Sequence, residues 1–533
     1  MKYMDDTQFT NDVVDNEKEL DALIGPQAFG HPKGLFYLFF AELWERFSFY
    51  GMRALLVLYM TKELLFDDTM SYGIYAAYGS LVYATPLIGG YIADKLIGYR
   101  KSIMLGGILM ALGHFVLSIE HPVFFYGSLA LLIVGNGLFK PNISSMVGGL
   151  YKEGDNRRDA GFTIFYMGIN LGAFIAPLIC GYLGEEFGWH YGFGLAGIGM
   201  LVGLIFFYRG TKDNVFGDIG LPPSQELYEK KTLGLNMGNM ITVLSFIAVP
   251  IFAIIVWQYE YESYLVYLLS AVILGVVIYI MTTVSAVERG RLIVIVYFTI
   301  LASLFWAIFE QAGSSLTTFA DRNVELSLLS ASQTNSINPG FIILLAIPFS
   351  WMWTKLSAAR KNPSSPVKFG IGLALLGLGF LIFALSAQSA DSNALTPMSY
   401  LVIGYGVLTI GELFLSPIGL SKVSELSPAK FVSFLLGVWF LSSFYGHFFA
   451  GGIAKLTSSE KGSENIFASG FFGDIVESVT GMTQSGAEAA GDSFSQLYSY
   501  VSVYASFGVI TIAVGLFAIL ISPIMKKLMH GIR

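Results

Sequence analysis

Long apolar segments alternate with shorter polar connections along almost the entire chain. About 20 consecutive apolar residues are enough for a helix to cross the hydrocarbon core of a membrane. Fourteen segments reach roughly this length, at about 36–61, 72–93, 102–119, 122–149, 160–184, 190–208, 237–257, 263–284, 291–318, 335–354, 369–387, 397–421, 430–454 and 497–524. Because only helices and closed barrels satisfy their backbone hydrogen bonds inside a membrane, the pattern predicts an all-α integral membrane protein with about fourteen transmembrane helices.

The positive charges follow the same alternation. Every second connection is basic, with Lys95, Arg100 and Lys101, then Lys152, Arg157 and Arg158, then Arg209, Lys212, Lys230 and Lys231, then Arg289 and Arg291, then Lys355, Arg360, Lys361 and Lys368, then Lys422 and Lys430, and finally Lys526, Lys527 and Arg533. The intervening connections contain Lys62, Arg322, Lys455 and Lys461. Since connections rich in Lys and Arg stay in the cytoplasm, both termini are expected there, and an even number of spans requires the same.

The longest basic connection divides the chain into its predicted parts. It contains GDIGLPPSQELYEKK, which is typical of a surface linker or a short amphipathic piece. The predicted parts are a cytoplasmic tail at 1–35, a six-helix bundle at 36–208, the linker at 209–236, an inserted helical hairpin at 237–284, a second six-helix bundle at 285–525 and a cytoplasmic tail at 526–533. The second bundle includes an outer loop at 457–492, whose Gly, Ser and Glu residues predict a solvated segment with a short helix at 465–479.

Composition supports the membrane assignment and excludes several classes of site. Of the 533 residues, 54% are hydrophobic and 13% are charged, whereas a soluble protein has about 25% charged residues. The net charge of −7 says little about partners, because the acids lie mostly in tails and loops, and no nucleic-acid partner is expected. Residues 1–34 are polar and acidic, so we expect no cleavable signal peptide. The single cysteine, Cys180, excludes an internal disulfide, and no His/Cys cluster predicts a metal site.

The first apolar segment carries four charges that lipid would reject. Glu42, Glu45, Arg46 and Arg53 fall on one stripe of a helix at 3.6 residues per turn. Left unpaired in lipid, each would cost roughly 2.5–3.5 kcal/mol. We therefore expect the stripe to face a polar interior, with Arg46 within reach of Glu42 at i, i+4. The alternative is a static ion-pair contact between helices.

Three more ionisable residues lie in later apolar segments: Lys140 beside Pro141, Glu310 and Glu412. The seven charges are divided between the two predicted bundles, as a site at the middle of the membrane between two bundles requires. If every base pairs with an acid, one carboxylate is left over. An unpaired carboxylate in a medium of low dielectric constant takes up a proton, which makes it a candidate proton carrier.

Polar and aromatic residues accompany these charges. Asn170 and Asn338 lie in apolar surroundings, where an amide needs a hydrogen-bonding partner. Four aromatic residues are predicted at a similar depth, namely Tyr50, Tyr78, Trp306 and Trp439. With 15% aromatic residues in the chain, packing or anchoring at the membrane surface explains each of them as well as lining a cavity does.

The connection after the second helix reads GGYIADKLIGYRK and contains Gly90, Asp94, Gly98 and Arg100. This spacing predicts a tight turn at Gly98, closed by a contact of Asp94 with a basic partner or a helix N-terminus. It resembles the loop between the second and third helices of the major facilitator superfamily. A structural latch without transport chemistry is the expected role.

Longer motifs carry a more specific resemblance. ELWERFSFYGMR, GNGLFKPNISSMVG, FTIFYMGINLGAFIAP, FWAIFEQ and GELFLSP, in this order along the chain, resemble the signatures of the proton-dependent oligopeptide transporter family. The hairpin at 237–284 resembles the two-helix insertion of the bacterial members. The resemblance implies the major facilitator fold and the symport of di- and tripeptides with protons by alternating access. It implies no cofactor, a monomeric transport unit embedded in membrane lipid, and a place in the bacterial cytoplasmic membrane.

The resemblance also implies residue roles. Arg46 and Lys140 would hold the peptide carboxylate with help from Tyr50, and Glu412 would receive the amino group. Trp306, Trp439, Phe440 and Tyr78 would wall the side-chain pockets. The full set that it assigns to the substrate is Arg46, Tyr50, Arg53, Tyr78, Lys140, Asn170, Trp306, Glu310, Asn338, Glu412, Ser416, Trp439 and Phe440. It assigns proton coupling to Glu42, Glu45, Arg46, Glu310 and Arg53, with Glu310 and Arg53 as an ion pair that responds to protonation.

Two positions depart from the family pattern. Phe49 replaces the first tyrosine of the signature, and Ala76 stands where animal members have a histidine in the second helix. His447 is expected to pack in the eleventh helix or to face its outer end, so coupling should depend on carboxylates rather than on imidazole.

The sequence leaves other functions open. The same fold with a different cargo would carry nitrate, a modified amino acid or another small anion. A receptor without transport is a further alternative, and an enzyme is disfavoured because no nucleophile, metal or cofactor motif appears.

Overall fold

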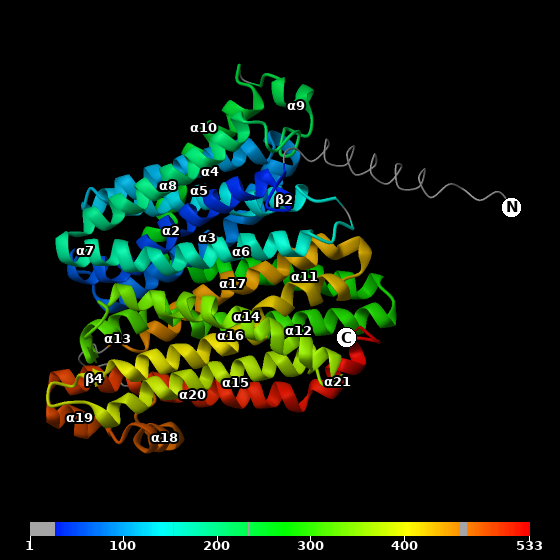
Figure 1. The fold of residues 1–533 in the computed structure, drawn as a ribbon. Coiled ribbons are helices and arrows are strands. Elements are labelled where there is room, and N and C mark those ends of the chain that lie inside the picture. Colours follow the sequence, from blue (N-terminus) through cyan, green and yellow to red (C-terminus); the bar gives the residue numbers. More distant parts are fainter. Residues whose placement is uncertain (1–26, 153, 233, 459–465, 533) are drawn as a thin grey trace. The chain divides into compact units, whose positions relative to one another are not determined.

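The computed structural model describes residues 27–152, 154–232, 234–458 and 466–532, apart from the side chains of Ser416, Pro417 and Ser433. The predicted tail at 1–26 and part of the outer loop, 459–465, therefore lie outside the described residues. Helices make up most of the described chain (Figure 1). Twelve of them are long and apolar enough to cross a membrane. With the charged first helix and the tyrosine-rich second helix the total is fourteen, which confirms the predicted fold class.

The first part of the chain contains α2 (Lys33–Lys62), α3 (Asp68–Ile92) with the π-helical turn η1 (Ala93–Ile97), α4 (Tyr99–Leu117), α5 (Pro122–Gly149), α6 (Arg158–Ala176) with η2 (Pro177–Gly181) and α7 (Tyr182–Phe187), and α8 (Trp189–Lys212). A short helix α9 (Gln225–Glu229) lies in the linker, and the hairpin consists of α10 (Met237–Trp257), η3 (Tyr259–Tyr261) and α11 (Glu262–Thr283). Two short strands, β1 (Gln27–Ala28) and β2 (His31–Pro32), pair antiparallel before α2.

The later part contains α12 (Ala286–Phe309), η4 (Glu310–Gly313), α13 (Ser315–Asn323), η5 (Ser332–Ser336), α14 (Ile337–Ala358), α15 (Ser365–Leu385), η6 (Ser386–Ser389), α16 (Met398–Leu426), η7 (Ala429–Phe431), α17 (Val432–Lys455), α18 (Gly470–Thr480), α19 (Gln484–Ala490), α20 (Asp492–Leu520) and α21 (Ser522–Leu528). The strands β3 (Val324–Glu325) and β4 (Thr396–Pro397) pair in parallel.

Most predicted spans agree with these bounds within a few residues, but three were predicted as single helices and are interrupted. The span at 291–318 changes to a 3₁₀ turn at Glu310, the span at 160–184 contains the π-helical turn η2, and the last span ends at Leu520 before α21 begins. The first two breaks lie inside apolar segments, where hydrophobicity alone gives no sign of them. The short helix predicted in the outer loop corresponds to α18, and α19 follows it without having been predicted.

The chain divides into two compact units. The first unit contains residues 1–50, 85–176 and 193–252, and the second contains 51–84, 177–192 and 253–533. Three elements, namely α2, α3 and the hairpin, have residues in both units. This division does not follow the linker, so the bundles at 36–208 and 285–525 remain a prediction.

Within the first unit, α4 packs closely on α5. A Cβ atom added to Gly106 would lie 2.5 Å from the carbonyl oxygen of Gly135, so only glycine permits this crossing. The α10 helix lies against the same pair of helices through apolar contacts around Leu109, Val134 and Leu138.

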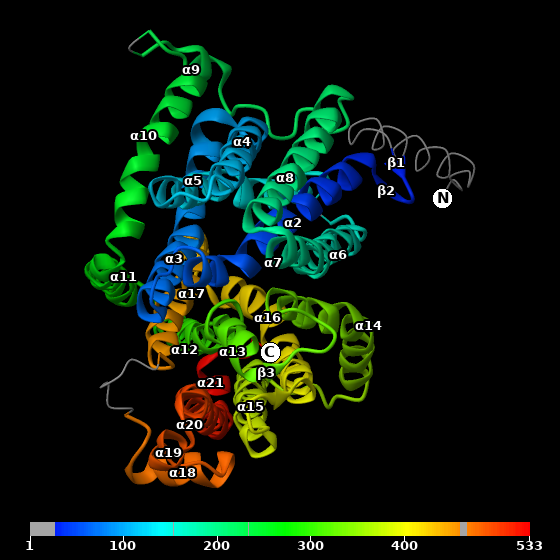
Figure 2. The ribbon, with the colours of Figure 1, turned by 90° about the vertical axis from the view of Figure 1, so that its left-hand side faces the viewer.

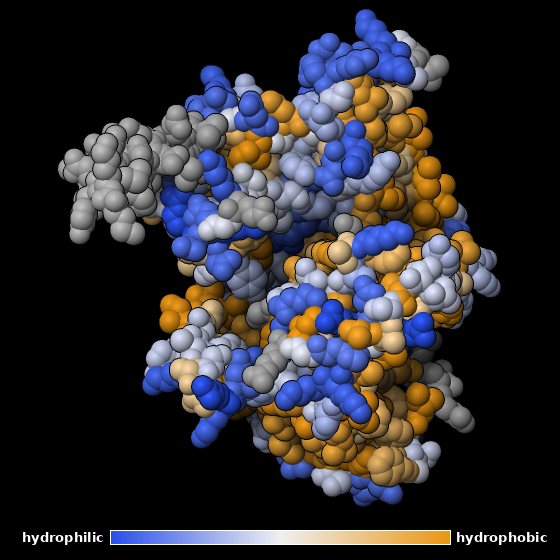
Figure 3. Space-filling view, turned by 90° about the vertical axis from the view of Figure 1, so that its right-hand side faces the viewer, coloured by the Kyte–Doolittle hydropathy of each residue, from blue (hydrophilic) through white to orange (hydrophobic). Residues whose placement is uncertain are grey.

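Within the second unit, α15 packs against both α16 and α20, and α12 packs against α17 (Figure 2). The α11 helix lies on α17 and on α3 through contacts around Val266, Leu441 and Phe444. Apolar side chains form broad areas on the face drawn in Figure 3, as expected for helices whose outer sides meet lipid.

Candidate functional site

Arg46 is the centre of a buried ionic cluster in the first unit. Its guanidinium donates two hydrogen bonds of 2.5 Å to the carboxylate of Glu45, and its Nε lies 3.5 Å from Glu42 Oε1. The three residues are 0–5% exposed. The predicted contact with Glu42 is present, but the closer partner is the adjacent residue Glu45, which a spacing rule for helix faces does not find. Two parallel hydrogen bonds make this pair strong and fix its orientation.

Lys140 joins the same cluster from α5. Its ammonium forms an ion pair with Glu42, which therefore lies between two cations. The cluster contains two acids and two bases and is neutral as a whole. Neutral pairing is what allows ionised groups to remain buried at this depth. The Lys140 side chain is 28% exposed, so it is the most accessible member.

The other predicted residues of the first unit lie on α2 and α6. The Arg46 guanidinium carbon is 5.0 Å from the ring centre of Phe49 and 5.9 Å from that of Tyr50. Phe49, which stands where the family signature has a tyrosine, thus keeps an aromatic face beside the Arg46 cation. Asn170 is buried and donates a 3.0 Å hydrogen bond to the carbonyl of Tyr166 in its own helix.

Arg53 and Glu310 form a buried ion pair in the second unit. Arg53 also donates through Nε to the hydroxyl of Tyr75 at 2.6 Å. Glu310 is the first residue of η4, at the point where the α-helical geometry of α12 ends. The change from α-helical to 3₁₀ geometry therefore occurs at the residue that forms the ion pair with Arg53.

Glu412 is the carboxylate that remains after the bases are paired. Its partner is Asn338, which donates to Glu412 Oε2 at 2.9 Å and to the hydroxyl of Thr409 at 3.0 Å. In the part of the chain that the structure describes, Glu412 forms no salt bridge, whereas Arg46, Arg53 and Lys140 each do. Glu412 is 7% exposed, so a buried carboxylate in the second unit is held by an amide rather than by a cation.

The aromatic candidates have different environments. Tyr78 is 2% exposed, Trp306 contacts Phe309 edge-on, and Trp439 is largely buried. Phe440 is 53% exposed, unlike a residue enclosed by its own unit. The side chain of Ser416 is among those outside the description.

The predicted turn is present at Gly98, which has a φ of 78°. Arg100 donates through Nε to the carbonyl of Ile219 at 2.7 Å, and its second contact is with the carbonyl of Gly217. The turn is therefore joined to the linker. Asp94 makes its side-chain hydrogen bond with Tyr99, and Gly90 lies near Pro141.

In the next basic connection, hydrogen bonds from Arg157 lower the pKa of the Asp155 carboxyl.

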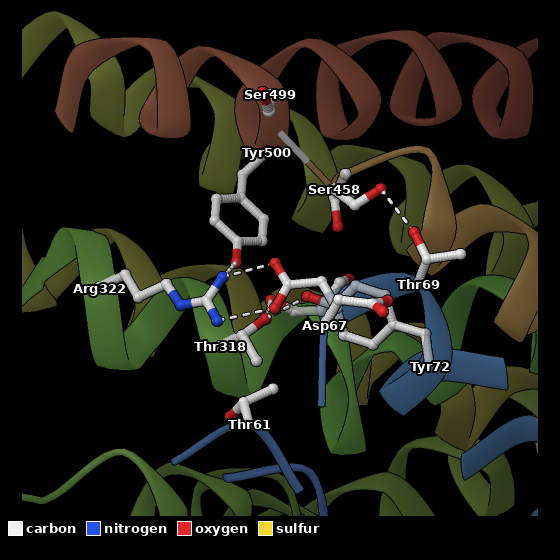
Figure 4. A network of polar contacts seen from close by, with 12 residues as sticks. Thr61, Asp67, Thr69, Tyr72, Thr318, Arg322, Ser458, Ser499 and Tyr500 are labelled. Carbon is white, nitrogen blue, oxygen red and sulfur yellow. Dashed lines mark hydrogen bonds and ion pairs between the residues drawn. The ribbon is translucent and has the colours of Figure 1, made fainter. Parts of the chain in front are cut away.

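A network at one end of the second unit was not predicted (Figure 4). Arg322 binds Asp68 through two hydrogen bonds of 2.6 and 2.7 Å and donates to the hydroxyl of Tyr500 at 3.1 Å. The hydroxyls of Tyr72 and Thr318 are 2.6 Å apart beside it. In the sequence Asp68 and Arg322 are ordinary charges next to polar connections, and only their pairing in space distinguishes them.

The long apolar helices and the buried ionic groups of both units, in the part of the chain that the structure describes, are typical of a multi-pass membrane transport protein. The family model PTR2, the POT family, matches residues 100–469. Over 530 residues the chain is 36% identical to the uncharacterized transporter YclF of Bacillus subtilis (strain 168), covering 97% of this chain and 99% of that protein. It is 36% identical over 439 residues to the di-/tripeptide transporter of Lactococcus lactis subsp. lactis (strain IL1403), covering 78% and 87%.

The structure agrees with these relatives. A crystal structure of peptide transporter POT in complex with sulfate matches with a TM-score of 0.75 and 34% identity, covering 95% of this chain and 98% of that chain. The chain therefore belongs to the POT family of proton-dependent oligopeptide transporters, which confirms the prediction from the motifs. It is a transporter and not an enzyme.

Proposed function

We propose that the protein imports di- and tripeptides together with protons by alternating access. The observation that supports this proposal is that each unit holds buried groups suited to one terminus of a peptide. The first unit offers the cations Arg46 and Lys140, and the second offers the carboxylate Glu412 with the amide of Asn338. A peptide is a zwitterion whose backbone termini are independent of its side chains, so charged groups of both kinds recognise peptides of many sequences.

The proposed roles follow from this chemistry. Arg46 and Lys140 bind the peptide carboxylate, and the hydroxyl of Tyr50 assists them. Glu412 binds the amino group, with Asn170 and Asn338 as hydrogen-bonding partners. Around these groups the peptide side chains meet Tyr78, Trp306, Trp439, Phe440 and Ser416.

Proton coupling follows from the pairs already present. Lys140 is neutralised by Glu42, so a peptide carboxylate must compete with Glu42 for it. A proton on Glu42 removes the competitor, and the same reasoning applies to Glu45 and Arg46. In the second unit, protonation of Glu310 releases Arg53. One proton that moves inward through about 100 mV gains roughly 2.3 kcal/mol, which drives accumulation.

The proposed setting is the cytoplasmic membrane of a bacterium, with both termini inside. The alternation of Lys and Arg among the connections supports this orientation. A single chain supplies all the proposed groups, so we propose a monomeric transport unit.

Uptake into proteoliposomes tests the proposal. Vesicles with an alkaline, electrically negative interior should accumulate labelled dialanine, and a protonophore should abolish the accumulation. Unlabelled tripeptides should compete with dialanine, whereas nitrate should not. Competition by nitrate without competition by tripeptides would identify an anion transporter instead, and the absence of any flux would favour a receptor.

A further inference from the structure

His447 of α17 lies beside the Arg53–Glu310 pair. Its Nε2 atom is 3.7 Å from Glu310 Oε1, and Arg53 binds the other carboxylate oxygen, Oε2. The imidazole is 4% exposed and stacks on the ring of Tyr83, with 4.9 Å between ring centres and 25° between planes. The sequence predicted only that this histidine packs or faces the outer end of its helix. Its position instead gives the carboxylate two nitrogen-bearing neighbours, one on each oxygen.

Gly79 of α3 leaves the space that the imidazole ring of His447 occupies. A Cβ atom on Gly79 would lie 2.5 Å from Nδ1 of the imidazole, so any larger residue would displace the histidine. The titratable groups that face His447 from the elements around it are Glu310 of η4, Arg53 of α2 and Tyr83 of α3. Neither ring nitrogen has a hydrogen-bonding partner among the described residues, so both remain able to exchange a proton.

His114 of α4 provides an internal comparison. It is also completely buried, at 0% exposure, and its ring nitrogens likewise lack hydrogen-bonding partners within the described ranges. Among those residues, however, only His447 of the histidines lies within 4 Å of a carboxylate. A buried histidine in this protein therefore does not always lie beside an acid, and the proximity of His447 to Glu310 is specific to this site.

We propose that His447 shares the coupling proton with Glu310. This proposal rests on the proposed function. The proton leaves Glu310 Oε1 as that O–H bond breaks, and an N–H bond forms at His447 Nε2. The product is a carboxylate beside an imidazolium, and the reverse step restores the starting state. At 3.7 Å the transfer needs a small side-chain movement or one bridging water.

Both protonated states weaken the hold of Glu310 on Arg53. In one of them Glu310 is neutral, and in the other the imidazolium competes with the guanidinium for the carboxylate. Two sites for one proton hold it more often than a single site does, so His447 and Glu310 together retain the coupling proton better than Glu310 alone.

The variant His447→Gln tests this role, with His114→Gln as the matched control. Proton-driven dialanine uptake is measured in proteoliposomes over a range of external pH, and dialanine affinity is measured by counterflow. In His447→Gln the pH of half-maximal uptake should fall by about 0.3 unit or more, because one of two sites for the proton is lost, while the affinity stays unchanged. His114→Gln should behave like the wild type. An unchanged pH profile in His447→Gln, or an equal shift in both variants, would show that His447 only packs.

The two proposals fail in different ways. If the wild-type protein shows no proton-driven peptide uptake, the proposed function is wrong. If it does and His447→Gln keeps the same profile, only the role of His447 is wrong.

A second measurement leaves His447 in place and so does not depend on the folding of its variant. Histidines labelled with ¹⁵N are titrated in the wild type and in Glu310→Gln. One imidazole should change its titration midpoint by about half a unit or more when the carboxylate is removed. Identical midpoints for every histidine in the two proteins would contradict the proposal.

Discussion

Asp68 and Arg322 join the first turn of α3 to the last turn of α13 through two hydrogen bonds of 2.6 and 2.7 Å. A second pair joins Lys62 to Asp321 at 2.5 Å, and Asp321 is the residue before Arg322. Arg322 and Asp68 are 23% and 16% exposed, whereas the Lys62 side chain is 43% exposed. The less exposed pair, Asp68 with Arg322, therefore contributes more to holding this end of the second unit together, because exposed pairs are worth little. We expect this contact to break when its end of the protein opens during the proposed alternating access.

Asp68→Asn should loosen this end. A hydrogen bond to a charged group is worth about 1.5–3 kcal/mol, so the closed arrangement should lose at least about tenfold in population relative to the open one. The measurement is the rate at which Ser71→Cys reacts with a membrane-impermeant thiol reagent, with Cys180→Ala in the background to remove the natural cysteine. Ser71 is buried and follows Asp68 by three residues in α3. Labelling should therefore be slow in the protein with Asp68 and faster in Asp68→Asn.

The exchanged variant Asp68→Arg with Arg322→Asp is the control for that experiment. It restores opposite charges at the two positions and should restore slow labelling. Equal labelling rates in the parent and in Asp68→Asn would show that the pair does not hold the end closed.

Glu310→Gln should separate transport from coupling. The glutamine side chain has the same shape as glutamate but cannot be ionised. Its contact with Arg53 therefore no longer responds to pH. We expect proton-driven dialanine accumulation to disappear and peptide counterflow to remain. Full accumulation against a gradient in this variant would remove Glu310 from the coupling role.

The sequence predicted the helices and the buried charges well, because apolar length and the cost of a charge in lipid are local properties. It did not predict partners that depend on how helices cross. The expected contact of Arg46 with Glu42 is real, but the shorter one is with Glu45. The 3₁₀ turn that places Glu310 lies inside an apolar run and leaves no mark in hydrophobicity. The approach of His447 to the same carboxylate depends on Gly79 of another helix, and no pattern within either segment shows it.

Lys140→Ala should weaken the binding of free dipeptides by about tenfold or more, since a hydrogen bond to a charged group contributes about 1.5–3 kcal/mol. Glu42 keeps its contact with Arg46 in this variant, so the remaining cluster retains one cation. The measurement is the apparent dialanine affinity in counterflow, and Lys140→Arg is the control that keeps the charge. Normal affinity in Lys140→Ala would show that the peptide carboxylate is bound elsewhere.

Glu412→Gln should act on the other terminus of the peptide. The variant can still accept a hydrogen bond from Asn338, so the local structure is kept while the negative charge is lost. We expect dialanine affinity to fall by about tenfold, whereas weak competition by N-acetylated dialanine should be the same in the variant and the wild type. If both ligands lose affinity equally, Glu412 supports the fold or another part of the substrate and does not recognise the amino group.

Gly106→Ala should destabilise the first unit, because the new methyl group meets backbone and not a flexible side chain. It would lie 2.5 Å from the carbonyl oxygen of Gly135 and 2.8 Å from the amide nitrogen of Phe139, so α4 and α5 must separate. Overpacking of this kind costs about 1–3 kcal/mol. Gly127→Ala in α5 is the matched control, since no atom lies within 4 Å of its added Cβ and alanine favours the helix. The thermal midpoint in detergent should fall for Gly106→Ala and stay level or rise for Gly127→Ala. A midpoint for Gly106→Ala at or above the wild-type value would mean that the two helices do not cross as closely as the structure has them.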